Sequence, residues 1–307
     1  MDRDDSYNEE LEARTRQVFD AHHREQVENP DTYRRLVSLL SDEYFQLPPD
    51  WFKGKQVLDA GCGSNANASW AFLELGAAHV HSVDLGSDWM DVADAALAEF
   101  GDRSSLGSEN VLGLSLKDDT YDFVHCAGVL HHTADPRRGH SELVRVTKPG
   151  GYTFVSVMAN GKGLLYQFFN LMRDRYKQDE EFRAAIDNLS MEGVNASMDW
   201  LLTEKNKHEP IEPGAEPVLR GLIDADLLLT IKDRVQAPTY HDFDFTEEQI
   251  AQWFTDAGCE QVERITRYTY GFSNLRRFLA PMYLHYDHPL ARFWFGDGYV
   301  QMIGRKP

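Results

Sequence analysis

Cysteine is scarce in this sequence, with only three among 307 residues. Cys62, Cys126 and Cys259 are too few and too far apart for a disulfide framework of the kind that small secreted domains use. Two of them lie within glycine-containing or apolar motifs described below. We therefore expect all three to be small packing residues and not nucleophiles.

Long apolar runs are also lacking. No stretch approaches the roughly 20 apolar residues that span a bilayer. The opening residues, Met1-Asp2-Arg3-Asp4-Asp5, are unlike the basic and then apolar start of a secretory signal. We therefore expect a cytoplasmic protein that does not enter a membrane. The 42% hydrophobic content still suffices for one large core, or for a core with an appended domain, and we expect the second arrangement.

Positive charge is in short supply. Lys and Arg number 31 against 50 Asp and Glu, which gives a formal net charge of −19. Arg137-Arg138 and Arg276-Arg277 are only pairs, so the sequence displays no basic patch that could hold a phosphate backbone. These features argue against a nucleic-acid partner. Strong acidity is also a weak indication of a saline habitat.

Metal-ligand spacing is absent as well. The pairs His22-His23 and His131-His132 are the nearest approach to it, and adjacent residues on a helix point to different faces. We therefore predict no metal site.

The most informative feature present is the stretch from Val57 to Asn65, where a short apolar strand runs into glycines. Gly61 and Gly63 allow a sharp turn and close backbone approach to a ligand, and a helix is expected over 66–75. A second apolar run ends on Asp84, twenty-one residues after Gly63. This is the position of the acid that accepts both ribose hydroxyls in βαβ nucleotide-binding units. The spacing predicts a nucleotide site.

Asp59 separates two kinds of nucleotide. Nicotinamide enzymes usually carry a small or apolar residue before the first glycine, whereas an acid at that position suits a cationic ligand such as S-adenosylmethionine. The chain also resembles the class I S-adenosylmethionine-dependent methyltransferases over residues 55–158, and more weakly over 245–268 and 299–304. Four motifs in order carry the resemblance: Leu58–Gly63, Val83–Leu85, Tyr121–His132 and Leu143–Tyr152.

The resemblance implies an α/β fold with a doubly wound, mostly parallel seven-stranded sheet. It also implies S-adenosyl-L-methionine as methyl donor. One departure is Asn65, where relatives often have a third glycine; its amide could touch the amino-acid end of the cofactor or bond to its own backbone in a turn. The cofactor-binding residues that the motifs imply are Asp59, Ala60, Gly61, Cys62, Gly63, Asn65, Asp84, Leu85, Asn110 and Cys126.

Four regions follow from the patterning. They are an N-terminal helical segment (1–50), which in related enzymes often folds over the cofactor; a cofactor-binding core (51–158); an inserted helical lid over the substrate (159–245); and the C-terminal part of the core (246–307), with an aromatic insertion at 270–297. The insertion is too long for an ordinary connection and too apolar for a disordered linker.

Helices and strands are expected within these regions from caps and periodicity. Asp135-Pro136 begins a helix to Thr147, and the turn Lys148-Pro149-Gly150-Gly151 ends it. A strand is expected at 152–158, helices at 164–176, 182–189 and 218–231 with a Pro-rich linker at 210–217, a helix at 246–257, and strands at 262–266 and 299–303.

The expected chemistry is undemanding, because a sulfonium methyl group is already electrophilic. The protein must hold donor and nucleophile in line, and remove a proton where the nucleophile carries one. His131 and His132 follow the fourth strand, where they could contact the acceptor or take its proton; a structural role is the alternative. Tyr240 and His241, at the exit from the insertion, are further catalytic candidates, with a surface turn as the alternative.

The aromatic insertion offers one more set of candidates. Its residues could form a pocket for a cationic or sulfur-containing acceptor, or could simply pack the insertion or a subunit contact. The set comprises Tyr268, Tyr270, Tyr283, His285, Tyr286 and His288.

A methyltransferase acting at O, N or S of a small-molecule acceptor is the favoured function, because a large lid suits a small acceptor. A saline habitat would favour a zwitterion such as methionine, whose thioether needs no base. Protein or RNA methylation is an alternative, although His125–Gly128 lacks the Asn-Pro-Pro-Tyr type of motif. A nicotinamide-dependent oxidoreductase and a non-catalytic cofactor-binding subunit also stay open. A homodimer is possible.

Overall fold

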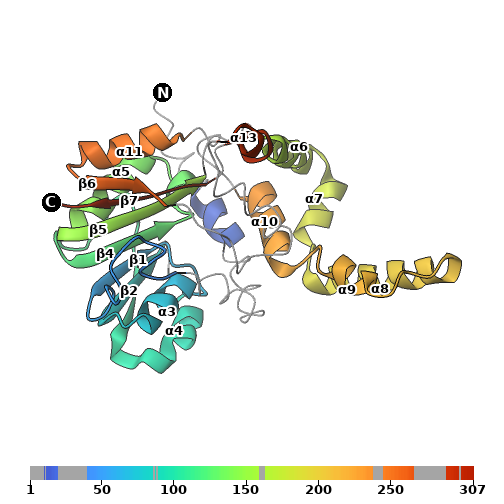
Figure 1. Ribbon diagram of the computed structural model, residues 1–307, viewed down its shortest axis with the longest axis horizontal. Coiled ribbons are helices and arrows are strands. Elements are labelled where there is room, and N and C mark those ends of the chain that lie inside the picture. The colour runs from blue at the N-terminus through green and yellow to red at the C-terminus, as the bar shows by residue number, and fades with distance from the viewer. Residues whose placement is uncertain are drawn as a thin grey trace.

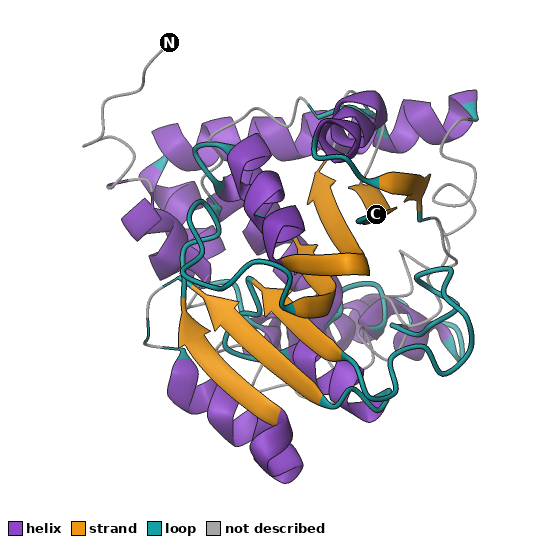
Figure 2. Cartoon of the chain, turned by 90° about the vertical axis from the view of Figure 1, so that its left-hand side faces the viewer, coloured by secondary structure: helices purple, strands orange, loops and turns teal. Residues whose placement is uncertain are grey.

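The structure is a computed structural model, and it describes residues 10, 12–19, 40–85, 87, 89–158, 163–237, 245–265, 288–296 and 299–307. Its described strands form one seven-stranded sheet (Figures 1 and 2). They are β1 (Gln56–Ala60), β2 (His79–Asp84), β3 (Ser104–Ser108), β4 (Tyr121–Ala127), β5 (Thr147–Met158), β6 (Glu260–Arg264) and β7 (Tyr299–Arg305).

The strand order is β3-β2-β1-β4-β5-β7-β6. The first five strands are mutually parallel, whereas β7 runs antiparallel to both β5 and β6. The order reverses between β1 and β4, so their carboxyl ends border the crevice where doubly wound sheets bind ligands. The expected fold class is confirmed.

Helices cover both faces of the sheet (Figure 1). The central strands are therefore buried on both sides. Val57 belongs to a core cluster that includes side chains of α3 (Asn67–Glu74) and α4 (Met90–Leu97). The neighbouring Leu58 belongs to a second cluster, which includes side chains of α5 (Pro136–Val146) and α11 (Glu247–Asp256). Successive residues of β1 thus point into different cores. Short helical turns, η1 (Ala98–Arg103) and η2 (Leu130–His132), precede β3 and α5 respectively.

Local capping signals were accurate. The Asp135 side chain accepts a hydrogen bond from the Arg138 N–H, and Pro136 begins α5. A capping box begins α11, in which Thr246 accepts from the Gln249 N–H and the Gln249 side chain accepts from the Thr246 N–H. These two helices therefore begin where the sequence predicts.

Other boundaries differ from the prediction. The expected turn at 148–151 lies inside β5, where a register shift opposite Tyr121/Phe123 accommodates it. The single helix expected at 218–231 is wrong, because the chain forms α9 (Ala215–Arg220) and then α10 (Ala225–Gln236), with Gly221 and Asp224 between them. Helix α8 (Met191–His208) was not predicted.

The inserted segment is helical, as expected. It contains α6 (Leu164–Gln178), α7 (Glu180–Asp187) and α10, which share a small core of Tyr176, Ile186 and Val235. Helices α8 and α9 project from this unit as an arm (Figure 1). The described part of the aromatic insertion contains α13 (Pro289–Phe295), which lies near α6.

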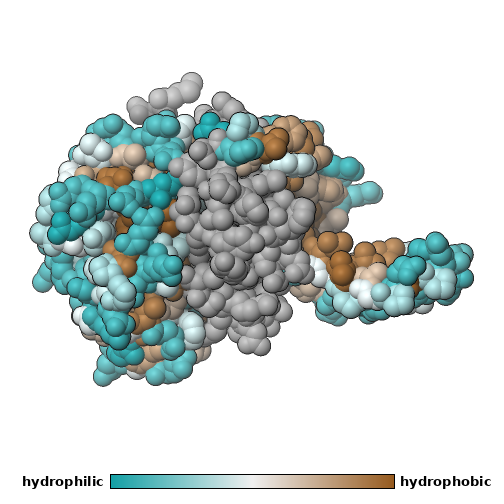
Figure 3. Space-filling view, in the orientation of Figure 1, coloured by the Kyte–Doolittle hydropathy of each residue, from teal (hydrophilic) through white to brown (hydrophobic). Residues whose placement is uncertain are grey.

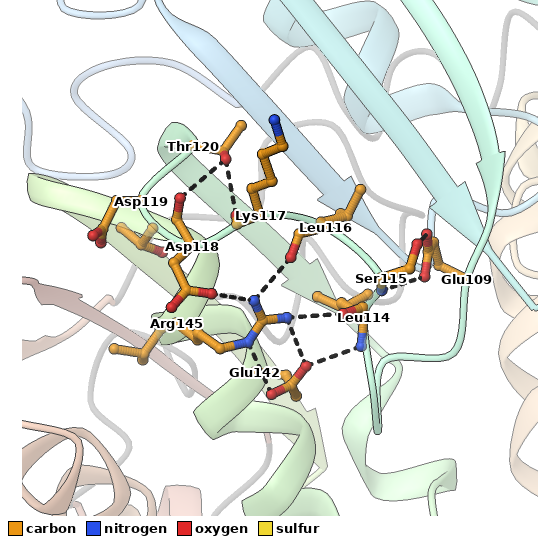
Figure 4. Close-up of polar contacts among 12 residues, drawn as sticks. Glu109, Leu114, Ser115, Leu116, Lys117, Asp118, Asp119, Thr120, Glu142 and Arg145 are labelled. Carbon is orange, nitrogen blue, oxygen red and sulfur yellow. Dashed lines mark hydrogen bonds and ion pairs between the residues drawn. The ribbon is translucent and has the colours of Figure 1, made fainter.

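An arginine hub fixes the loop between β3 and β4 (Figure 4). Arg145 of α5 donates to the carbonyl oxygens of Leu114 and Leu116 at 2.8 Å each, and it pairs with Glu142 and Asp118. The two acidic partners raise the pKa of Arg145. Arg145 thereby anchors the residues that follow Asn110, one of the predicted cofactor contacts.

No helix in the described part of the chain is long and apolar enough to cross a membrane.

His140 of α5 carries a pH-dependent contribution to stability. Its ring is fully buried at 4.3 Å from the ring of Phe254, and neither ring nitrogen has a hydrogen-bond partner among the described residues. This burial lowers the pKa of His140 from 6.5 to about 3. Between these values the unfolded chain binds more protons than the folded chain, so stability falls as pH falls below 6.5.

We predict that the free energy of unfolding decreases by about 1.4 kcal/mol per pH unit from this residue alone below pH 6.5, or about 2 kcal/mol by pH 5. Urea titrations from pH 7.5 to 5 measure the slope. A His140→Phe variant keeps an aromatic ring in place but has no titrating group there, so the contribution of His140 to this slope should disappear. Identical slopes in the two proteins would refute the assignment.

Candidate active site

The loop between β1 and α3 is fixed to the end of β2 by backbone hydrogen bonds. The N–H groups of Gly61 and Cys62 donate to the Val83 carbonyl oxygen at 2.7 and 3.1 Å. The Gly63 N–H donates to Asp84 Oδ2 at 2.8 Å. The glycine loop and the acid predicted to bind ribose therefore form one structure at the carboxyl edge of the sheet.

Gly61 also brings this loop against the loop that follows β4. Its φ is +82°, and a Cβ atom added there would lie 2.1 Å from Val129 Cγ2. The space beside the glycine thus holds the Val129 side chain, whereas the sequence suggested that bare backbone was needed there for the cofactor. The cofactor loop and the loop predicted to border the methyl group are consequently in direct contact.

Asp59 lies in a buried polar network beneath the loop. Its Oδ1 is 2.8 Å from His125 Nδ1, and its Oδ2 accepts from the Ser69 hydroxyl at 2.6 Å. Ser69 in turn accepts from the Ser82 hydroxyl at 2.7 Å. Both carboxylate oxygens are therefore engaged inside the protein, and this acid ties β1 to β4 and α3. Cofactor binding by Asp59 stays a prediction, with support of the loop as the role that the geometry favours.

Asp84 combines a structural role with its predicted one. Besides the bond from Gly63, its Oδ1 accepts from the Leu85 N–H at 2.6 Å. Each carboxylate oxygen has a second lone pair, so ribose hydroxyls could also be accepted. Its partly exposed position at the end of β2 fits a nucleoside ligand.

The other predicted cofactor contacts have different surroundings. The Asn65 side chain accepts from the Asn67 N–H at 3.1 Å, which is the local turn considered as the alternative. Asn110 likewise forms a turn, accepting from the Leu112 N–H at 2.9 Å. The side chains of Ala60 and Cys126 are fully buried in the core, so only their backbones could face a ligand.

The thiols are protonated packing groups, as expected. All three cysteines are buried. Burial raises the pKa of Cys62, which nearby Asp84 and Asp59 raise further, and burial also raises the pKa of Cys126. Burial raises the pKa of Cys259 to about 11.

His131 and His132 lie together behind the end of β4, with ring centroids 4.2 Å apart. The His131 Nδ1 accepts from the Met158 N–H at 3.4 Å. Burial, His132 and Arg234, in that order, hold the pKa of His131 well below its ordinary value. The ring is therefore neutral with its other nitrogen protonated, which suits hydrogen-bond donation better than proton removal.

His132 connects the site to the N-terminal segment. Its ring lies 4.9 Å from the ring of Phe19, in the helix formed by residues 12–19. The other two catalytic candidates, Tyr240 and His241, lie outside the described residues, as do Tyr268, Tyr270, Tyr283, His285 and Tyr286. His288 is exposed and caps α13, where its Nδ1 accepts from the Leu290 N–H at 3.1 Å. Among described residues, no cluster of metal-ligating side chains is present.

Two features of the site had no sequence signal. His125 is separated by 66 residues from Asp59, and strand pairing alone brings them together. Arg234 belongs to α10 of the insertion, and it lies after the end of the helix that was predicted at 218–231.

Comparison with known proteins agrees with this geometry. A family described as "Methyltransferase domain" matches residues 58–155, which span the glycine loop, Asp84, β4 and most of β5. The chain contains a class I S-adenosylmethionine-dependent methyltransferase domain. S-adenosylmethionine is the methyl donor of this family.

Curated relatives of the methyltransferase domain cover only part of the chain. A ubiquinone biosynthesis O-methyltransferase of Nitrosospira multiformis is 35% identical over 37% of this chain and 47% of its own length. A phosphoethanolamine N-methyltransferase 2 of Caenorhabditis elegans is 29% identical over 37% of this chain and 26% of its own. The chain thus spans about half or less of these relatives.

Among solved structures, a methyltransferase of Thermotoga maritima, described as a possible histamine N-methyltransferase, aligns with 95% of this chain and 99% of its own. The TM-score is 0.47 at 14% identity.

Replacing Asp84 tests the methyltransferase cofactor site. We expect Asp84→Ala to weaken S-adenosylhomocysteine binding by about 10- to 150-fold, or about 1.5–3 kcal/mol, because a charged acceptor is lost. Calorimetry measures this loss. A 2′-deoxy analogue separates ribose contact from loop support, since the wild-type preference for the hydroxyl should disappear in the variant. An unchanged affinity in folded Asp84→Ala would exclude the assignment.

Proposed function

We propose that the chain is an S-adenosylmethionine-dependent methyltransferase that acts on O, N or S of a small-molecule acceptor. The observation that carries the proposal is the junction of the glycine loop, Asp84 and Val129 at one edge of the sheet, within the matched domain. When bound, S-adenosylmethionine would supply an electrophilic methyl group.

The residues of this chain would then do three things. Asp84 and the backbone around Gly63 would hold the nucleoside. The loop after β4, from Val129 to His132, would border the methyl group and exclude water. His131 would orient the acceptor by donating a hydrogen bond, because its Nδ1 already accepts one.

We propose the insertion (159–245) as a lid over the acceptor and the N-terminal segment (1–50) as a second cover. The contacts of Arg234 with Met158 and of Phe19 with His132 support these roles. Tyr240 and His241 stay proposed acceptor contacts.

The acceptor itself is proposed to be an amino-acid-like zwitterion, with the methionine thioether as the specific candidate. A neutral His131 that serves as donor agrees with a nucleophile that needs no base. The two curated relatives are named as a ubiquinone biosynthesis O-methyltransferase and a phosphoethanolamine N-methyltransferase, and small acceptors agree with both names.

Two measurements test the proposed function. Calorimetry should show binding of S-adenosylhomocysteine and none of NAD⁺; the reverse result would favour an oxidoreductase. A metabolite screen that detects S-adenosylhomocysteine release should then identify the acceptor. Cofactor binding without turnover of any metabolite, peptide or RNA would favour the non-catalytic alternative.

We also propose that the chain forms a homodimer through the arm of α8 and α9. Its side chains Trp200, Leu201 and Val218 are 63%, 52% and 64% exposed. Hydrophobic residues gather on the surface of the arm where it leaves the rest of the molecule (Figure 3). The arm's Lys205, Lys207 and Arg220 are already ion-paired within the arm, which leaves the apolar groups for a second copy. Sedimentation velocity should show a dimer that Trp200→Asp dissociates.

A further inference from the structure

A cluster of four side chains joins the insertion to the sheet at its carboxyl edge. Met158 ends β5 and pairs directly with Tyr299, which begins β7. The Met158 N–H donates to His131 behind β4. Arg234 of α10 lies over this group, with its Cζ 5.0 Å from the centroid of the Tyr299 ring. We call these residues the strand-end cluster.

Arg234 has weak partners for a guanidinium group. One of its terminal nitrogens contacts the Met158 thioether, which is a poor acceptor, and its Cζ lies over the Tyr299 ring. Among the residues that the structure describes, no carboxylate forms an ion pair with it. Arg175 and Arg220, elsewhere in the same insertion, do pair with carboxylates.

The absence of a carboxylate partner matters because of where Arg234 lies. The side chain is half-buried, and its charge is one of the causes that lower the pKa of His131. The chain carries a net charge of −19, so acidic partners are plentiful elsewhere. A partly desolvated cation that has no carboxylate partner in the described ranges, and that lies at the edge carrying the glycine loop, has hydrogen-bonding capacity for an anionic ligand.

We propose that Arg234 binds an oxyanion of the methyl acceptor, a carboxylate or a phosphate, and thereby determines which acceptors are used. This inference rests on the proposed function and narrows its substrate class. The planar guanidinium can hold either oxyanion through two parallel hydrogen bonds. Because Arg234 belongs to the insertion, anion binding would also hold the insertion against the strand ends.

The first test measures S-adenosylhomocysteine release with two matched acceptor pairs. L-methionine is compared with L-methioninamide, and phosphoethanolamine with ethanolamine. The wild-type protein should prefer the anionic member of whichever pair it uses by about tenfold or more in kcat/KM, mainly through KM. Arg234→Met should abolish this preference, Arg234→Lys should keep part of it, and the control Arg175→Met should match the wild type.

The second test needs no turnover. Protein saturated with S-adenosylhomocysteine is titrated with L-methionine, acetate and inorganic phosphate at constant ionic strength, and Tm is measured. At least one probe should raise the Tm of the wild type and of Arg175→Met, but not that of Arg234→Met. The probe that acts distinguishes a carboxylate from a phosphate site.

Three results would overturn the inference. They are an equal preference within both pairs, an unaltered preference in Arg234→Met, and no response of the cofactor-bound wild type to any probe. A lower Tm in Arg234→Met with an intact preference would make Arg234 a structural contact only. Failure to bind S-adenosylhomocysteine would instead overturn the proposed function.

Discussion

Gly61→Ala should remove measurable cofactor binding, with a loss of at least about 100-fold in affinity. The new methyl group would lie 2.1 Å from Val129 Cγ2, and φ is +82° at this position. Backbone strain of about 1–3 kcal/mol and overpacking of about 1–3 kcal/mol act together. Calorimetry with S-adenosylhomocysteine and the midpoint of urea unfolding measure both consequences.

Two further variants separate the clash from the strain. Gly61→Ala combined with Val129→Ala removes the Cγ atoms and leaves the nearest contact at 3.2 Å, so binding should recover in part. Gly54→Ala, with a φ of +73° and no atom within 4 Å of the new Cβ, carries strain alone and should bind normally. No recovery in the double variant would mean that contact with Val129 is not what Gly61 provides.

Asp59→Ala is expected to destabilise the protein by about 3–5 kcal/mol, because it breaks a buried charge-assisted pair and leaves the partners unsatisfied. The side chains of Asp59 and His125 are 3% and 6% exposed. The lesion lies directly before the glycine loop, so cofactor affinity should fall as well. Chemical denaturation monitors the first effect and calorimetry the second.

A double-mutant cycle checks the cause. Asp59→Ala with His125→Leu should be less destabilised than the sum of the two single variants, since no buried imidazole then lacks its partner. Asp118→Ala removes an exposed partner of Arg145 and should cost only about 0–1 kcal/mol. Simple additivity in the cycle would show that Asp59 and His125 are not energetically coupled.

Sequence reasoning succeeded where the determining interactions are local. The glycine loop, the cap at Asp135 and the capping box at Thr246 each depend on residues within a few positions of one another. The strand ending on Asp84 was equally clear, because a buried parallel strand is a continuous apolar run.

Prediction from the sequence failed for helices that bury few apolar side chains, and for contacts between residues that are far apart in the sequence. α8 contains Gly193, Asn195 and Ser197, and most of its side chains are exposed, so no apolar stripe marked it. The division between α9 and α10 was overlooked, although Asp224, which accepts from the Leu227 N–H at 3.0 Å, is a recognisable cap.

The candidate site shows the same division. The spacing to Gly63 singled out Asp84, whose Oδ2 accepts from the Gly63 N–H, and ribose binding by Asp84 stays a prediction. The hydrogen bonds of the two Asp59 oxygens with His125 and Ser69 could not be predicted, because His125 belongs to a strand that is far away in the sequence. Arg234 could not be predicted as a site residue either, because a single arginine near the end of a helix forms no recognisable motif.

The small core shared by α6, α7 and α10 has an evolutionary consequence. Tyr176, Ile186 and Val235 pack among themselves and with neighbours from the same insertion, apart from the two cores of the sheet. If the insertion covers the acceptor as proposed, mutations that reshape the acceptor side can accumulate there while the sheet keeps its stability. An ancestral enzyme could exchange one acceptor for another by remodelling this unit, without having to rebuild the site of its methyl donor.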